Sequence, residues 1–127
     1  MSFSATRQTL YAIISSIEQD LRSLAIEHFR DLGNPAEIFG AELHSKCVSR
    51  MLKDASARPG DPTFNTLIHY LDFQEAHQLL RTHATALPVT LNDNIARHSP
   101  AIIALTPIRN RVMHARPLSL DDLPIAL

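Results

Sequence analysis

The sequence predicts an all-α protein, an antiparallel bundle of four main helices with one or two short extra helices. Apolar residues recur at spacings of three and four over several long stretches, as in helices that bury one face. Strand-like alternation of apolar and polar residues is essentially absent, and the 127 residues include only 3 glycines. The length suits one domain that is large enough to enclose a core.

The first helix is expected over about residues 4–31. Its predicted buried face consists of Leu10, Ile13, Ile14, Ile17, Leu21, Leu24 and Phe29 or the neighbouring His28. These residues keep the spacing of three and four over several turns, so one stripe of the helix faces the core. Gly33 follows, and glycine is the residue that most often ends a helix.

The second helix is expected from Asn34 to about Ala57. Asn34 is a favourable N-cap, Pro35 suits the first helical position, and Glu37 can reach back as in a capping box. Its predicted buried residues are Phe39, Leu43, Cys47, Met51 and Leu52. Residues 58–62 hold two prolines and a glycine, which predicts a loop.

A short helix or turn is expected over residues 65–71, before the third main helix. Asp72 and Glu75 form a second cap pair and open a helix through about Thr85. Its predicted inward residues are Ala76, Leu79 and Leu80. Residues 88–94 are expected to be a connector or a short helical turn.

The last helical region allows two interpretations because it contains two prolines. Ser99-Pro100 and Thr106-Pro107 each join an N-cap residue to a residue suited to the first helical position. Either one helix is kinked at Pro107, or a short helix ends and a second begins there. A helix beginning at Thr106 would place free N–H groups and the positive end of its dipole beside Arg109. A phosphate could bind at such a helix start.

The expected domain spans residues 1–116, and residues 117–127 are expected to be a C-terminal exit segment or linker. The chain begins with Met-Ser-Phe-Ser and has no apolar signal core and no apolar run of membrane-spanning length. Cys47 is the only cysteine, so no disulfide can form within the chain. We therefore expect a cytoplasmic protein with no membrane partner and with Cys47 as a small buried residue.

Composition and spacing argue against several kinds of site. The net charge is −1, so no global basic field attracts nucleic acid, although ten arginines against two lysines mildly favour phosphate recognition. The 7 histidines show no His-Glu-x-x-His spacing and no i, i+4 pair, so no metal site is expected. No glycine-rich phosphate loop or Gly-x-Ser-x-Gly turn occurs, and no cofactor is expected.

The candidate catalytic residues are Arg109, Asn110 and His114. Asn110 and His114 are four residues apart and share a helix face. Arg109 lies about 140° round the helix from His114, but its long side chain can swing toward that face. An Arg–His spacing alone is weak, because Arg22 and His28 form a second match. A solvent-facing helix end with cations nearby is the structural alternative.

Three supporting candidates accompany this motif. Glu18 and Arg22 form an i, i+4 pair beside the apolar stripe of the first helix. This pair has two interpretations: a surface ion pair of small energy, or a polar pair that positions residues of the last helix. Arg111 is a further cation beside the motif.

Residues 108–114, Ile-Arg-Asn-Arg-Val-Met-His, in the last helix of a small helical domain resemble the signature of the HEPN superfamily. Glu18 on the long first helix and the start of the third helix at residues 70–73 also resemble that family. The resemblance covers most of residues 5–116, and its specific part is Arg-Asn-x-x-x-His. It implies a HEPN-like helical domain with Arg109, Asn110 and His114 at its active site.

The resemblance implies a metal-independent ribonuclease of a toxin or antiviral-defence system. It also implies a homodimer whose two motifs form a composite site for an RNA substrate. An antitoxin, or a sensor or ATPase domain or partner, would restrain or trigger such an enzyme. The alternative is a non-catalytic HEPN-like module of a larger protein that dimerises or binds a nucleotide, RNA or protein.

Overall fold

The computed structural model describes residues 3–54 and 62–113. Throughout these residues the chain is helical where it is regular, and no strand occurs in them. The elements in order are α1 (Phe3–Phe29), α2 (Pro35–Phe39), α3 (Ala41–Lys53), α4 (Phe64–Leu67), η1 (Ile68–Tyr70), α5 (Phe73–Thr82), η2 (Ala84–Ala86) and α6 (Val89–Met113), where η is a 3-10 helix. The all-α class is confirmed, and the four-helix antiparallel bundle stays a prediction.

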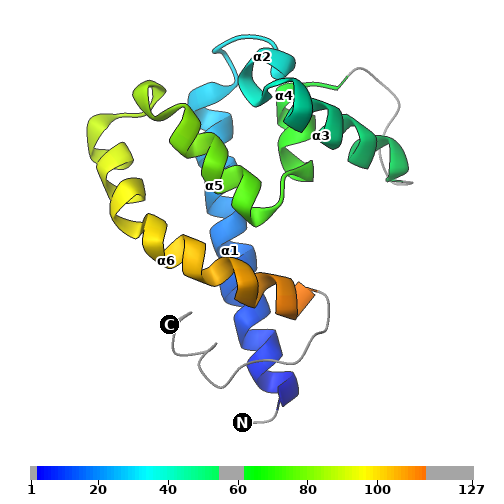
Figure 1. The fold of residues 1–127 in the computed structure, drawn as a ribbon, viewed down its shortest axis with the longest axis vertical. Helices are drawn as coiled ribbons and strands as arrows, with labels where there is room; N and C mark the ends of the chain where they lie inside the picture. The colour runs from blue at the N-terminus through cyan, green and yellow to red at the C-terminus, as the bar shows by residue number, and fades with distance from the viewer. Residues whose placement is uncertain (1–2, 55–61, 114–127) are drawn as a thin grey trace.

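Helix α1 forms the long axis of the molecule, and α5 and α6 pack against it and against each other. Figure 1 shows α5 and α6 running in opposite directions, with η2 at the turn between them. Helices α2, α3 and α4 gather around the C-terminal end of α1 (Figure 1). The N-terminal half of α1 is therefore left to contact the C-terminal part of α6.

The core contains most of the residues that the periodicity predicts. The buried predicted residues are Leu10, Ile14, Leu21, Phe29, Phe39, Cys47, Met51, Ala76, Leu79 and Leu80. Ile17, Leu24 and Leu43 pack against this core while partly exposed. Leu52 is 77% exposed, so its predicted burial is wrong. Cys47 and Met51 share the inward face of α3, and Leu52 lies about 100° further round the helix.

The predicted second helix is two helices, because the chain turns at Gly40. Gly40 has φ +83°, a backbone conformation that side chains with a Cβ rarely adopt. The Asn34 cap is confirmed, since its side-chain oxygen accepts from the Glu37 N–H at 2.9 Å. The Glu37 carboxylate accepts from the Asn34 side-chain amide at 2.7 Å rather than from its backbone. Helix α3 ends at Lys53, with Asp54 as its C-cap, four residues before the predicted end at Ala57, and residues 58–61 of the predicted loop lie outside the described residues.

The predicted capping box at the start of α5 is present. The Asp72 side chain accepts from the Glu75 N–H at 2.8 Å, and the Glu75 carboxylate accepts from the Asp72 N–H at 3.0 Å. Helix α5 ends at Thr82, three residues before the predicted end. The expected helical turn over residues 65–71 is confirmed as α4 and η1.

The prolines do not divide the last helix: α6 is continuous and contains both Pro100 and Pro107. Of the two interpretations of the region at Pro107, the single helix is therefore the one observed, and the N-caps at Ser99 and Thr106 are wrong. Of the two expectations for residues 88–94, the helical turn is observed as the start of α6 at Val89, and the connector is wrong. Each hydroxyl instead donates back to the carbonyl four residues earlier, Ser99 to Ile95 at 2.8 Å and Thr106 to Ile102 at 3.4 Å. Such back-bonding competes with regular helical bonding and bends a helix.

The curvature of α6 follows from where its prolines lie. Each proline lacks an N–H and pushes its ring against the carbonyl four residues earlier, so the helix bends away from it. Pro100 and Pro107 are both exposed and seven residues apart, so they share a face and their bends add. Figure 1 shows the resulting curve of α6 across α1.

The N-terminal half of α6 is held by α5. The His77 Nε2 atom lies 2.9 Å from the Ser99 Oγ atom. Since the Ser99 hydroxyl hydrogen is directed to the Ile95 carbonyl, His77 donates and therefore carries its proton on Nε2. Arg81 adds a contact with the Asn92 side chain at 3.5 Å.

A polar cluster joins α3 to the start of α5. The Arg50 guanidinium binds both Glu75 carboxylate oxygens at 2.6 and 3.2 Å, and donates to the Tyr70 carbonyl at 2.8 Å. Burial acts to raise the pKa of Glu75, but the bonds from Arg50 and the Asp72 N–H outweigh it, so this pKa lies below its ordinary value. Burial raises the pKa of Cys47 to about 11, as expected for a thiol that fills the core.

Replacing His77 by Gln should reduce the loss of stability on acidification. Burial, and then the charge of Arg81, lower the pKa of His77 below its ordinary value of about 6.5. His77 therefore binds a proton more readily in the unfolded chain than in the folded protein. As the pH drops below about 6.5, protonation of His77 in the unfolded chain lowers the free energy of unfolding. Urea unfolding at several pH values should show that the free energy of unfolding falls less steeply with decreasing pH in His77→Gln than in the wild type. His69→Gln, at an exposed position, should keep the wild-type slope, and equal slopes for all three proteins would contradict this account.

Candidate functional site

The predicted site residues that the structure describes come from two helices. Glu18 and Arg22 lie on α1, and Arg109, Asn110 and Arg111 lie in the last two turns of α6. The bend of α6 brings its C-terminal part across α1 at this level (Figure 1). His114 lies outside the described residues.

Glu18 is the centre of this cluster. It is only 8% exposed, and its Oε1 lies 3.6 Å from the Arg109 Nη2 while its Oε2 lies 3.9 Å from the Arg22 Nη2. The predicted Glu18–Arg22 pair is therefore present, and the same carboxylate also reaches α6. Of the two interpretations of this pair, the geometry favours the one in which it contacts the last helix.

The two arginines make further contacts on either side of Glu18. Arg22 donates to the Leu71 carbonyl at 2.6 Å, which ties α1 to the link between η1 and α5. Arg109 donates to the side-chain oxygen of its neighbour Asn110 at 3.3 Å. The cluster therefore connects α1, the η1–α5 link and α6 through one carboxylate and two guanidinium groups.

The cluster contains polar atoms without hydrogen-bond partners. In the described part of the chain, Glu18 Oε1, Arg22 Nε and Arg109 Nε are buried and make no hydrogen bond. Buried polar atoms in folded proteins are usually paired, so three such atoms in one cluster are unusual for a purely structural site. Two guanidinium charges against one carboxylate leave a net positive charge, which suits a site that holds an anion.

Arg111 joins the site through its backbone. Its carbonyl and that of Val112 accept hydrogen bonds from the Arg7 Nη1 at 3.0 and 3.1 Å. A cation near the C-terminal end of a helix interacts favourably with its last carbonyls. The sequence interpretation missed Arg7. Its position could have suggested the contact, because residues 7, 18 and 22 share one face of a helix.

The phosphate site expected at a helix start near Thr106 is wrong. Because α6 is continuous through this segment, its N–H groups serve the helix and no N-terminus lies beside Arg109. The positive charge near Asn110 therefore comes from side chains and not from a helix dipole. Within residues 3–54 and 62–113, no group of His, Cys, Asp and Glu could hold a metal ion.

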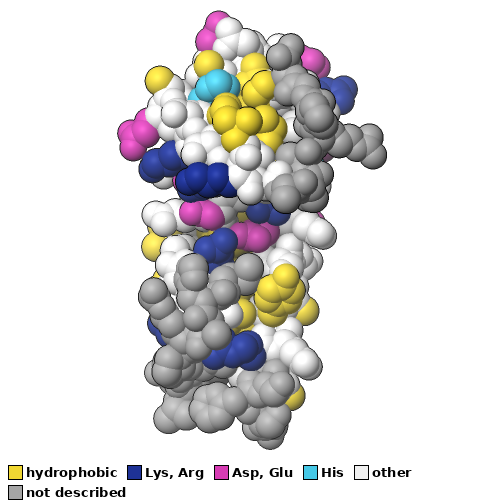
Figure 2. Space-filling model, turned by 90° about the vertical axis from the view of Figure 1, so that its right-hand side faces the viewer, with side chains coloured by type: hydrophobic (Ala, Val, Ile, Leu, Met, Phe, Trp, Pro, Cys, Tyr) yellow, Lys and Arg dark blue, Asp and Glu magenta, His cyan; other side chains and the backbone are white. Residues whose placement is uncertain are grey.

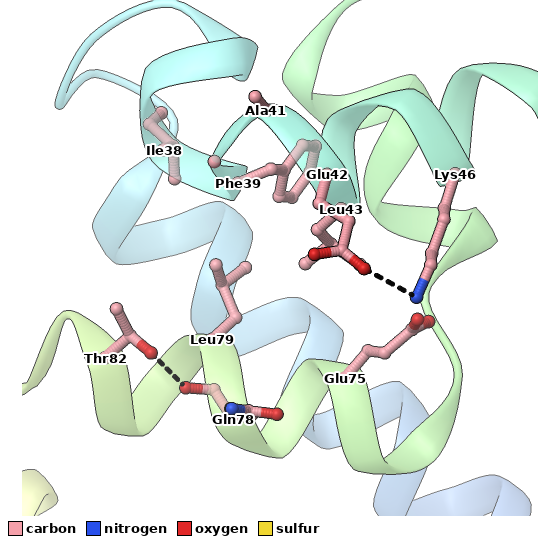
Figure 3. A pocket seen from close by; sticks show the side chains of 11 residues that line it. Ile38, Phe39, Ala41, Glu42, Leu43, Lys46, Glu75, Gln78, Leu79 and Thr82 are labelled. Atoms are coloured by element: carbon pink, nitrogen blue, oxygen red, sulfur yellow. Dashed lines mark hydrogen bonds and ion pairs between the residues drawn. The ribbon is translucent and has the colours of Figure 1, made fainter.

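A pocket of about 440 Å³ lies away from this cluster, between the start of α3 and α5. Figure 3 shows its apolar floor and the polar side chains of Glu42, Lys46 and Gln78 around it. None of the predicted site residues lines it. On the face shown in Figure 2, cations and carboxylates lie close together across the middle of the molecule.

Comparisons with protein-family models, with curated proteins and with solved structures each give no match to this chain. No helix in the part of the chain described by the structure is long and apolar enough to cross a membrane.

The Glu18–Arg109 contact should stabilise the fold more than an exposed pair at the same distance. A double-mutant cycle with Glu18→Gln and Arg109→Gln should give a coupling energy of about 1–2 kcal/mol, because both side chains are largely buried. The Glu42–Lys46 pair is also 3.6 Å apart but exposed, and its double-mutant cycle should give a coupling energy of only about 0.3 kcal/mol. Urea unfolding measures both couplings, and equal values would show that burial does not strengthen the Glu18 contact.

Proposed function

We propose that this chain is a HEPN-like, metal-independent endoribonuclease of a toxin or antiviral-defence system, which cleaves RNA at a composite site in a homodimer. One observation carries the proposal: Arg109 and Asn110 lie together on α6, with the Arg109 guanidinium anchored by the buried Glu18 of α1. The side-chain groups suited to hold a phosphate thus form one cluster at a helix–helix contact.

Arg109 has the chemistry needed at the reacting phosphate. A guanidinium can bind two non-bridging phosphate oxygens, and the attraction strengthens as negative charge develops during cleavage. Glu18 restricts where the guanidinium can lie, so less freedom is lost when substrate binds. Asn110 can orient the phosphate or the neighbouring guanidinium through its amide.

His114 supplies the proton transfer in this proposal, on the strength of the sequence motif. An imidazole takes the proton from the ribose 2′-hydroxyl, and the 2′-oxygen attacks the phosphorus atom. The bond from phosphorus to the 5′-oxygen breaks, and a second imidazole in its protonated form donates to that oxygen. The products are a 2′,3′-cyclic phosphate and a 5′-hydroxyl. A second copy of the chain would supply the second histidine.

Substrate delivery needs more than the charge of this chain. The net charge of −1 gives little general attraction to RNA. An incoming phosphate also meets the carboxylate of Glu18 beside Arg109, which lowers its affinity for that guanidinium. These two features favour RNA delivery by a partner or a tethered domain. They are also the features that favour the alternative, a HEPN-like module that dimerises or binds a ligand without catalysis.

Purified wild-type protein should cleave single-stranded RNA in EDTA and leave DNA intact. Arg109→Ala and His114→Ala should each slow cleavage by roughly a hundredfold or more, because each removes charge stabilisation or proton transfer. Arg97→Ala and His98→Ala are matched controls, since both residues are exposed on the same helix. Gel analysis of the products and their cyclic phosphate ends provides the measurement.

Two results would overturn the catalytic proposal. One is equal cleavage by wild type and His114→Ala, which would point to a contaminating nuclease. The other is a stable dimer with no RNA degradation and no growth arrest on expression, which would support the non-catalytic module.

A further inference from the structure

A second hollow lies where α1 meets the end of α6. It has a volume of about 340 Å³ and is lined by Arg7, Gln8 and Tyr11 of α1 and by Val112 of α6. Tyr11 is 52% exposed and is the one aromatic residue among the large, exposed apolar side chains of residues 3–54 and 62–113. An aromatic ring thus lies open to solvent beside an apolar wall and two polar side chains.

This hollow adjoins the Glu18 cluster along the same helix–helix contact. Tyr11 is seven residues before Glu18, which places it on the same face of α1 and about 10 Å along the axis. Val112 is three residues after Arg109, so the two lie on neighbouring turns of α6. Arg7 donates to the Val112 carbonyl and joins the two helices at the hollow.

We propose that Tyr11 is the stacking platform for a nucleobase of single-stranded RNA whose phosphate is held at Arg109. This inference rests on the proposed function and assigns to it a base-binding subsite. A nucleobase has an apolar face and a polar edge, and the hollow offers the same combination. The Tyr11 ring and Val112 meet the face, while the Gln8 amide can donate to or accept from the edge.

The site suits an unpaired base more than a duplex. A base in a duplex is already stacked on its neighbours, so its face is not available to a side chain. Stacking on one ring is tolerant of sequence, because every base has a π face. The expected preference is therefore for single strands, with modest discrimination among bases.

The test measures binding and cleavage separately. Binding uses a short single-stranded DNA oligonucleotide, which lacks the 2′-hydroxyl and is not cut. Tyr11→Leu should weaken this binding about tenfold, and Tyr11→Phe should change it less than about twofold, because the phenyl ring still stacks. Leu52→Ser removes another exposed apolar side chain, on α3, and should leave binding unchanged.

Tyrosine fluorescence gives an independent readout. The chain has 2 tyrosines and no tryptophan. In Tyr70→Phe the emission comes from Tyr11 alone, and the oligonucleotide should quench it after correction for absorbance. The Tyr70 hydroxyl donates a hydrogen bond to Asp54 and does not line the hollow, so this replacement should leave oligonucleotide binding intact.

The outcomes separate the subsite from the proposed function. RNA cleavage by wild type together with unchanged binding and rate in Tyr11→Leu overturns the subsite alone. Tyr11-dependent binding without cleavage supports the subsite and overturns the nuclease. A changed oligomeric mass of Tyr11→Leu, with unchanged oligonucleotide binding, overturns the subsite and assigns Tyr11 to a contact between copies.

Discussion

The structure of the candidate site depends on one buried carboxylate, Glu18, placed between the guanidinium groups of Arg22 and Arg109. A carboxylate at 8% exposure loses most of its hydration and is tolerated only where cations replace it. The two cations come from different helices, so the need to compensate Glu18 fixes α6 on α1. The contacts at 3.6 and 3.9 Å are ion pairs without short hydrogen bonds, which leaves donors unused.

The same carboxylate is linked to a second polar cluster through the backbone. Arg22 binds the carbonyl of Leu71, and Arg50 binds that of Tyr70, the residue before it. Two arginines from α1 and α3 therefore hold neighbouring carbonyls of one short segment, and Asp72 and Glu75 then cap α5. The polar contacts run in this way from α3 through the η1–α5 link and α1 to α6.

The sequence predicted features that depend on neighbours along the chain. The apolar stripe of α1, the Asn34 cap and the Asp72–Glu75 box all follow from residues within a few turns of each other. The Glu18–Arg22 pair was predictable for the same reason. The approach of Arg109 to Glu18 depends on the path of α6, which no local pattern determines.

The errors in the helix boundaries have two opposite physical causes. Serine and threonine before proline are typical N-caps in isolation, but inside α6 their hydroxyls find the carbonyls of Ile95 and Ile102 and the helix continues. Packing against α5 and α1 outweighs the cost of two prolines. Gly40 shows the opposite case, since a residue able to adopt φ +83° divides a stretch that periodicity alone predicts as one helix.

The unbroken course of α6 has a consequence for how this chain can change. Within a single helix each residue is turned 100° from the one before, so the orientation of Arg109 is set by the number of residues back to Ser99. One residue inserted between them would turn Arg109 away from Glu18 while His77 still held Ser99. The length between these two anchors is therefore fixed by geometry, whereas insertions at the η2 turn would leave that interval, and with it the site, unchanged.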